Sequence, residues 1–233
     1  MLSIITINKD NKSGLQKTIE SLSRLGKRDY QWVFIDSLST DGSVELANQF
    51  KTQGDVLISE NDTGIYNAMN KGVASAHGDF ILFLNSGDTL SPQIQSLDFM
   101  GQVAGHDLGL FGFQIRNILR KPRSNSWRFW SMPTSHQAII YSVKLLKQYP
   151  FDENYRFAAD FEHYLRINRN QLAIYSEDTA LIVNEPYGSD SHLPVLLAEY
   201  RHALIHNGYP PLWAHFVYWL KMYYLKWALR ERT

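Results

Sequence analysis

The first 88 residues alternate between short apolar runs and helical patterns, and this alternation is the strongest constraint on the fold. The runs are rich in β-branched and aromatic residues, which is typical of strands buried on both faces. Repeated strand–helix units predict a mostly parallel sheet with right-handed crossovers and flanking helices. The predicted strands cover residues 2–7, 32–35, 55–58 and 80–84, and the predicted helices cover roughly 15–25, 43–52 and 64–76.

The second half of the chain is less regular. Its apolar runs predict strands at 108–115, 138–141, 172–175 and 180–183, and its helical patterns lie at 158–168, 193–206 and 211–230. The sequence Asn-Gly-Tyr-Pro-Pro at 207–211 is rich in turn formers and marks the clearest seam. We therefore expect one α/β domain over 1–206 and a separate C-terminal helix over 207–233.

Composition excludes several classes of protein. Lys+Arg and Asp+Glu are both 23, and this neutral balance argues against a nucleic-acid binder. The absence of cysteine excludes a disulfide scaffold, a thiolate zinc site and a cysteine nucleophile. The apolar start is too short for a signal peptide, so we expect a cytoplasmic protein.

Polar residues follow three of the predicted strands. Asn8, Asp36 and Asp88 come after the first, second and fourth strands, at the sheet edge where α/β proteins bind ligands. Asp88 ends the tight turn Asn85-Ser-Gly-Asp, and a carboxylate there suits Mg²⁺ or Mn²⁺ bound against a diphosphate. The alternative is a turn residue that caps the helix after Ser91-Pro92.

Four sequence blocks resemble family 2 glycosyltransferases of the GT-A fold. Asp-Phe-Ile-Leu-Phe-Leu-Asn-Ser-Gly-Asp at 79–88 is similar to the acidic metal-binding motif, and Ser-Ile-Ile-Thr-Ile at 3–7 to the opening strand. Residues 34–43 and 60–72 resemble the family's "D-x-x-S-x-D" and "D-x-G-I-Y-x-A-M-N-x-G" blocks. Ser-His-Gln-Ala at 135–138 and the Asp160 helix are shared with bacterial colanic-acid, capsule and O-antigen assembly members.

The resemblance implies an inverting hexosyl transfer from a nucleotide-diphosphate sugar, with a UDP-sugar favoured over a GDP-sugar. It divides the domain into a nucleotide-binding half, 1–104, and an acceptor-side half, 105–206. Asp36 is expected to read the nucleobase and Asp88 to bind Mn²⁺ or Mg²⁺. The other residues expected at the donor are Thr6, Asn8, Asp62, Gly64, Tyr66, Asn70, Lys71, Asn85, Ser86 and Gly87.

An inverting transfer needs one carboxylate to take the proton of the acceptor hydroxyl. Asp160 is the candidate base, because small residues precede it and leave room for substrate. Glu162 is the rival; it points about 200° away on a helix, so only one of the two faces the pocket well. His136 and Gln137 are expected on the acceptor or donor-sugar side.

The metal motif departs from the family pattern, since Asn85 and Gly87 stand where carboxylates are often found. This leaves two alternatives open: metal-independent catalysis, and a catalytically silent protein that binds a nucleotide-sugar. A nucleotidyltransferase is disfavoured because the loop at 8–14 has a single glycine. A dinucleotide oxidoreductase is disfavoured because no G-x-G-x-x-G follows the first strand.

The C-terminal helix combines Trp and Tyr with Lys221, Lys226 and Arg230. The charges argue against a transmembrane span, whereas the composition suits a helix lying on a membrane surface. Packing against its own domain is the alternative. A saccharide acceptor linked to lipid at the cytoplasmic face of the inner membrane would match the assembly relatives, and the basic aromatic stretch 116–130 is a further candidate for lipid or diphosphate contact.

Overall fold

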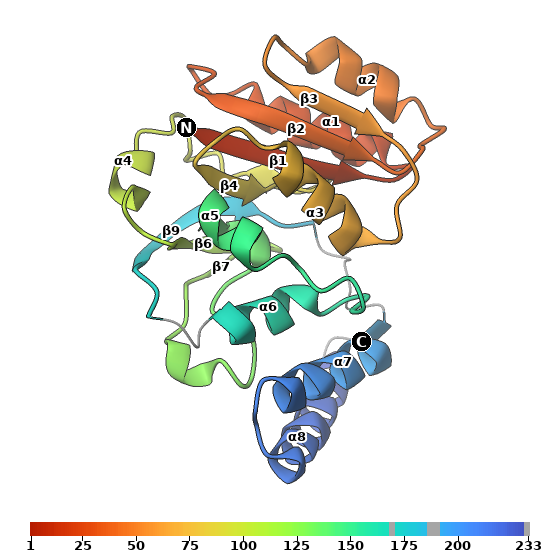
Figure 1. Ribbon diagram of the computed structural model, residues 1–233, viewed down its shortest axis with the longest axis vertical. Coiled ribbons are helices and arrows are strands. Elements are labelled where there is room, and N and C mark those ends of the chain that lie inside the picture. Colours follow the sequence, from red (N-terminus) through yellow and green to blue (C-terminus); the bar gives the residue numbers. More distant parts are fainter. Residues whose placement is uncertain (168–170, 186–191, 231–233) are drawn as a thin grey trace.

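The computed structural model describes residues 1–167, 171–185 and 192–230. Within them, nine strands form one sheet in the order β3-β2-β1-β4-β8-β6-β9-β5, with β7 paired to β6 (Figure 1). The strands are β1 (Leu2–Asn8), β2 (Tyr30–Asp36), β3 (Val56–Ser59), β4 (Phe80–Phe83), β5 (Thr89–Leu90), β6 (Leu108–Ile115), β7 (Ile118–Arg120), β8 (Ile139–Ser142) and β9 (Ile174–Val183). The helices are α1 (Lys12–Leu22), α2 (Ser43–Phe50), α3 (Ile65–Ser75), α4 (Met100–Val103), α5 (Val143–Gln148), α6 (Ala159–Ile167), α7 (Leu193–His206) and α8 (Pro211–Arg230).

The predicted parallel half is confirmed. Strands β3, β2, β1 and β4 are parallel neighbours, and the register of β1 and β2 places Asn8 opposite Asp36. Because β4 lies on the other side of β1, the turn that carries Asp88 leaves the same edge of the sheet. Asn8, Asp36 and Asp88 therefore lie at or just after the carboxyl ends of neighbouring parallel strands.

Alternate residues of the central strands face two different hydrophobic layers. On one face Ile4 and Trp32 pack with α1 and α2, and on the other Ile5 and Val33 pack with α3, α5 and α6. Both faces are covered, so the strand residues are buried throughout β2. This explains the continuous apolar runs, which lack the polar–apolar alternation of a half-exposed sheet.

The second half differs from the sequence prediction in two places. The runs at 172–175 and 180–183 belong to one strand, β9, which pairs parallel with β6 through register shifts around Gly112. The polar segment Glu177-Asp178-Thr179 looked like a loop because these residues sit where the ladder is irregular. A hairpin of β6 and β7 was also missed; its turn residues Arg116 and Asn117 both have positive φ angles, 51° and 62°.

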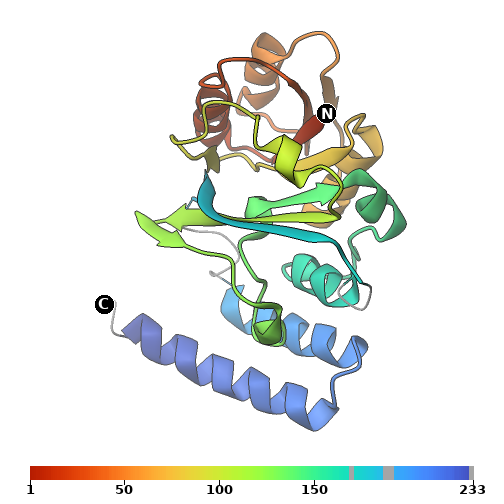
Figure 2. The same cartoon turned by 90° about the vertical axis from the view of Figure 1, so that its left-hand side faces the viewer.

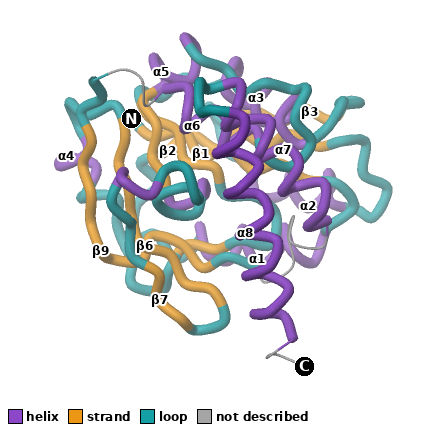
Figure 3. The backbone as a smooth tube through the Cα atoms, turned by 90° about the horizontal axis from the view of Figure 1, so that it is seen from below, coloured by secondary structure: helices purple, strands orange, loops and turns teal. Residues whose placement is uncertain are grey.

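Helices α7 and α8 pack against each other beneath the rest of the molecule (Figures 2 and 3). Glu199 of α7 fastens this layer to the domain, because its carboxylate accepts hydrogen bonds from the backbone N–H groups of Arg156, Phe157 and Ala158 at 2.8–2.9 Å. Those three residues lead directly into α6. The position of α6 therefore depends on a helix at the C-terminal end of the chain.

Helix α8 has two contrasting faces. Its inner face buries Ala214, Val217, Lys221 and Met222. Its outer face exposes Leu212, Trp213, Phe216, Trp219, Leu220, Tyr223 and Tyr224, which we call the aromatic face. Among the described residues, no helix is both long enough and apolar enough to cross a membrane.

Lys221 is the one charged side chain among those buried residues of α8. Its Nζ donates to the Trp130 carbonyl at 2.6 Å and lies 3.8 Å from the ring centre of Tyr200. Burial lowers the pKa of Lys221 to about 7, assisted by the charge of Arg123 and opposed by that of Asp160. Lys221 thus joins α8 to α7 and to the segment before β8, at the level of the Asp160 helix.

Candidate active site

A cleft of about 780 Å³ opens at the carboxyl ends of the parallel strands. One wall comes from the strand ends and the start of α3, and the opposite wall from the loop that leads to α6. The lining side chains include Asn8, Ser37, Asp62, Tyr66, Asn85, Ser86, Glu153 and Arg156. The cleft therefore lies where the alternating strand pattern predicted a ligand site.

Asp36 organises one corner of this cleft. Its buried carboxylate accepts hydrogen bonds from Asn8 Nδ2 (2.9 Å), from Ser39 N and Oγ (2.8 and 2.5 Å) and from Ser59 Oγ (2.8 Å). Burial by itself raises the pKa of Asp36, but these bonds outweigh it and leave the pKa below its ordinary value. Asn8 and Ser37 line the cleft in front of this ionised group.

The start of α3 forms the floor of the cleft. Asp62 Oδ1 accepts from Gly64 N at 3.0 Å, which closes the turn before the helix. Gly64 has φ of +140°, a conformation that favours glycine. Asp62, Gly64 and Tyr66 all line the cleft, at a helix end whose free N–H groups and positive potential suit an anion.

Three residues expected at the donor have structural partners instead. Thr6 is fully buried and its Oγ1 accepts from Trp32 Nε1 at 3.0 Å, because it faces the α1 side of the sheet. Asn70 is bonded in both directions to Phe151 of the acceptor half. Lys71 forms a 2.7 Å ion pair with Glu60, so its charge is used within the loop before α3. The family blocks locate these residues correctly in sequence, but their side chains do not line the cleft.

The turn after β4 reaches the cleft through Asn85 and Ser86, and Asp88 lies beside them. Asp88 Oδ1 accepts from Asn184 Nδ2 at 3.1 Å and from Glu185 N at 2.9 Å, and Gln137 also donates to the carboxylate. Burial raises the pKa of Asp88 to about 6 against these bonds. Gly87 has φ of +109°, and a Cβ there would overlap the Glu185 carboxylate.

The oxygen atoms around Asp88 fit a hard divalent cation. Asn85 Oδ1, Ser86 Oγ and Asn184 Oδ1 are buried and have no hydrogen-bond partner among the residues that the structure describes, although buried polar atoms are normally paired. Carboxylate and amide oxygens are the ligands that Mg²⁺ and Mn²⁺ prefer, together with phosphate oxygens and water. In the described part of the chain no three His, Cys, Asp or Glu side chains converge as a metal cluster, so a cation here would depend on its substrate for the remaining ligands.

Asp160 does not line the cleft itself, but it contacts a residue that does. Its Oδ1 accepts from the Tyr66 hydroxyl at 3.0 Å and from Phe161 N at 2.8 Å. Tyr66 of α3 lines the cleft, so the candidate base lies one side chain behind the lining. Asp160 is also close enough to His136 and Tyr141 to influence their ionisation.

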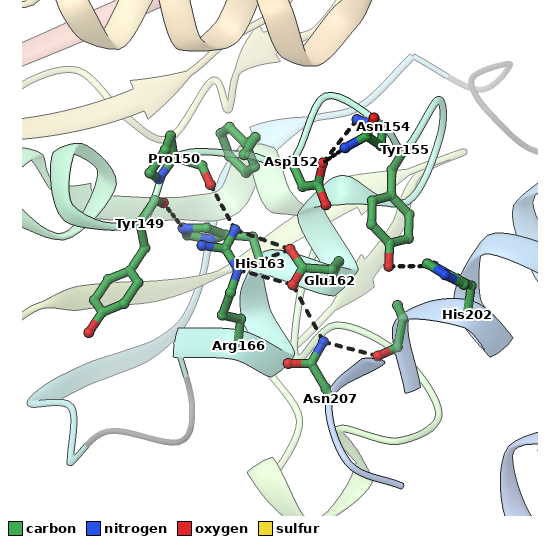
Figure 4. A network of polar contacts seen from close by, with 12 residues as sticks. Tyr149, Pro150, Asp152, Asn154, Tyr155, Glu162, His163, Arg166, His202 and Asn207 are labelled. Carbon is green, nitrogen blue, oxygen red and sulfur yellow. Dashed lines mark hydrogen bonds and ion pairs between the residues drawn. The ribbon is translucent and has the colours of Figure 1, made fainter. Parts of the chain in front are cut away.

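Glu162, expected as the rival on the acceptor side, has a different role. It is 1% exposed and forms an ion pair with Arg166 Nε at 3.0 Å (Figure 4). Arg166 also donates to the Pro150 carbonyl at 2.7 Å, and Asn207 donates to Glu162 from the end of α7. Because the two acids point to different sides of α6, Asp160 meets Tyr66 while Glu162 stabilises helix packing.

His136 and Gln137 lie in the short helical turn before β8. Gln137 is next to Asp88, and His136 is near Asp160. Gln137 bonds Asp88, and the ring of His136 packs 6.2 Å from that of Phe83 at the end of β4. Burial lowers the pKa of His136, so its imidazole is neutral near pH 7. Its Nδ1 is buried, and no described residue forms a hydrogen bond with it.

Sequence reasoning missed several residues at or near the cleft, including Ser37 and Glu153, which line it. Lys9 and Arg156 line it and are exposed cations, which suits a diphosphate. Glu185 and Asn184 hold Asp88 from the end of β9, and Glu185 supplies the nearby carboxylate that the thinned acidic motif lacks. The one sequence signal for Asn184 and Glu185 was that these two polar residues directly follow the predicted strand 180–183.

Comparison with known proteins agrees with this geometry. The profile of "Glycosyl transferase family 2" matches residues 3–159. The chain belongs to glycosyltransferase family 2. It is 30% identical over 191 residues to a PGL/p-HBAD biosynthesis glycosyltransferase of Mycobacterium bovis, covering 75% of this chain and 72% of that protein. It is 27% identical over 166 residues to the glycosyltransferase GlyG of Streptococcus pneumoniae, covering 58% and 54% of the two chains.

Solved structures show that this family 2 glycosyltransferase has the GT-A fold. The mannosyltransferase PcManGT of Pyrobaculum calidifontis, in complex with GDP-Man and Mn²⁺, superposes with a TM-score of 0.70 at 16% identity, covering 94% of this chain and 68% of that one. TarS 1-349 of S. aureus in complex with UDP gives 0.66 at 18% identity, covering 95% and 70%. The fold predicted from the sequence blocks is confirmed.

Proposed function

We propose that this glycosyltransferase transfers a sugar, with inversion, from a nucleotide-diphosphate sugar to a hydroxyl of a saccharide acceptor. The observation that carries the proposal is the hydrogen bond from Tyr66, which lines the cleft, to the carboxylate of Asp160. UDP and GDP-Man bound in structural neighbours support a nucleotide-sugar donor, and the printed name of the mycobacterial relative, a PGL/p-HBAD biosynthesis glycosyltransferase, supports a role in glycan synthesis.

In this mechanism Asn8, Ser37 and Asp36 form the nucleobase corner. Asp62, Gly64, Lys9 and Arg156 surround the diphosphate. Asn85, Ser86 and Asp88 would hold a divalent cation, which would supply positive charge to the diphosphate leaving group. Asp160 takes the proton of the acceptor hydroxyl as that oxygen bonds the anomeric carbon. The bond from that carbon to the diphosphate breaks, and the nucleoside diphosphate leaves with both bonding electrons.

A thermal-shift screen of UDP- and GDP-sugars with and without Mn²⁺ tests the donor assignment. At a hundredfold excess over Kd, a donor should raise Tm by about 5–10 °C, because ligand binding stabilises the folded state by mass action. The shift should depend on Mn²⁺ and be larger for one nucleotide. Nucleoside monophosphates, which lack the diphosphate, are the matched control. No shift with any donor would contradict the proposal.

The rival is a silent binder of nucleotide-sugars, favoured by the reduced acidic motif. Slow hydrolysis of the bound donor separates the two. An enzyme releases nucleoside diphosphate from the donor at a rate that depends on Asp160, whereas a silent binder gives the same thermal shift with no release. Release that is equal in wild type and Asp160→Asn would favour the binder.

We further propose that the aromatic face of α8 binds an anionic bilayer. The face continues onto a neighbouring segment, because Trp213 packs 5.8 Å from Phe129, which stacks on the exposed Trp127 at 5.9 Å. The same segment exposes Arg120, Arg123 and Arg128, which complement anionic lipid. Aromatic rings flanked by cations are typical of helices that lie in a membrane interface. A lipid-linked acceptor would then meet the enzyme at the membrane.

Replacing Phe216 and Trp219 together with alanine should weaken sedimentation with phosphatidylglycerol vesicles by at least about tenfold, because each ring contributes roughly 1.5 kcal/mol or more when buried. The residues are 55% and 66% exposed, so folding should be unaffected. His215→Ala, an exposed change on the same helix, is the control. Equal binding of both variants, or no binding by the wild type, would contradict the proposal.

A further inference from the structure

Tyr66 connects the two halves of the active site. It lies in the first turn of α3 and is 6% exposed, with its ring 5.6 Å from that of Phe151 in the acceptor half. Its hydroxyl donates to Asp160 Oδ1 at 3.0 Å across 94 residues of sequence. Because the bond is shielded from water, it constrains the carboxylate more than an exposed bond would.

The two oxygens of Asp160 have different surroundings. Oδ1 accepts from both the Tyr66 hydroxyl and Phe161 N. Oδ2 makes no hydrogen bond to any part of the chain that the structure describes. A base needs one oxygen fixed for orientation and the other available for the incoming proton. The asymmetry at Asp160 satisfies both needs.

We propose that Tyr66 is a positioning residue for the transfer reaction, holding Asp160 Oδ1 so that Oδ2 receives the acceptor proton. The inference rests on the proposed role of Asp160. It also gives the Tyr of the "G-I-Y" block a second task besides lining the donor cleft. The donor half would thereby set the orientation of the base in the acceptor half.

The groups around Asp160 are consistent with this role. Burial, followed by the charge of Asp160, raises the pKa of Tyr66 well above its ordinary value, so its hydroxyl remains a donor at working pH. Burial lowers the pKa of His136, which is therefore uncharged. Tyr141 on β8, Tyr200 on α7 and Lys221 on α8 are further titratable groups close to Tyr66 or Asp160.

Tyr66→Phe removes the hydroxyl and keeps the ring. We expect kcat to fall about tenfold, because the carboxylate loses the donor that orients it. Donor KM should stay within about twofold, since the ring still lines the cleft. A purely structural role would lower stability and leave the kinetic profile of the folded enzyme, its kcat and KM, unchanged.

Two further variants make the result decisive. Tyr30→Phe is the matched control, a buried tyrosine at the start of β2, and should keep the wild-type profile. In the Asp160→Asn background, Tyr66→Phe should cause no additional loss of rate. If Asp160→Asn is inactive but Tyr66→Phe has the wild-type profile, the positioning role is wrong. If Asp160→Asn remains active, the proposed base itself is wrong.

Discussion

Asp160→Asn should reduce kcat by about 10²–10⁴-fold, the usual contribution of a general base. The amide keeps the shape of the carboxylate and its oxygen can still accept from Tyr66, so the helix should fold normally. Donor KM should change little, because Asp160 acts on the acceptor proton. Initial rates with varied donor and acceptor, together with the donor thermal shift, measure both expectations. A loss of donor binding equal to the loss of rate would contradict the assignment.

Glu162→Gln is the matched contrast on the same helix. It removes one charge of the buried pair with Arg166, whose side chain is 27% exposed. The unpaired arginine should cost about 2–4 kcal/mol of unfolding free energy, somewhat less than for a fully buried pair. The folded fraction should retain its kcat. Asp160→Asn should therefore lower kcat with little change in stability, whereas Glu162→Gln should lower stability with little change in kcat.

Asp88→Asn is expected to weaken the Mn²⁺-dependent binding of a nucleoside diphosphate by about 100-fold. It removes the one negative charge of the turn that holds the cation, and a metal at a phosphate contributes several kcal/mol of charge stabilisation. Isothermal titration of UDP or GDP in the presence and absence of Mn²⁺ measures this loss directly. Binding without metal should be nearly the same in variant and wild type.

The control for this change is Asp98→Ala, an exposed acid outside the cleft. It should bind Mn²⁺ and nucleotide like the wild type. If Asp88→Asn retained full metal-dependent binding, the cation would have to be held elsewhere. If the wild type bound nucleotide equally with and without Mn²⁺, metal-independent catalysis, the alternative left open by the thinned motif, would be favoured.

The fold was largely predictable because local patterns determine it. Buried parallel strands require unbroken apolar runs, and the polar residues that end them, such as Asn8 and Asp36, meet at one edge whatever the loops do. That Asp160 and Glu162 point to different sides of α6 also followed from helix geometry, whereas the role of Asp160 as the base stays a prediction. These inferences need only neighbouring residues and the regular dimensions of a helix or strand.

The fate of individual side chains was not predictable in the same way. Thr6, Asn70 and Lys71 stand in family blocks, but distant partners determine where they point: Trp32, Phe151 and Glu60. The strand β9 was divided in error because its ladder continues through polar residues paired with a distant strand. Glu185 reaches Asp88 from 97 residues away, so its contribution is visible only in three dimensions.

The carboxylate of Glu199 links helix α7 to the loop that precedes the candidate base. The family profile ends at residue 159, immediately before the candidate base, yet the loop that aims this base is tied to α7 by three hydrogen bonds. Grafting the tail of another relative onto residues 1–159 would leave those three N–H groups unsatisfied unless the new helix brought an acid to the same place. In this chain, the loop before the candidate base thus depends on one anchoring side chain in α7.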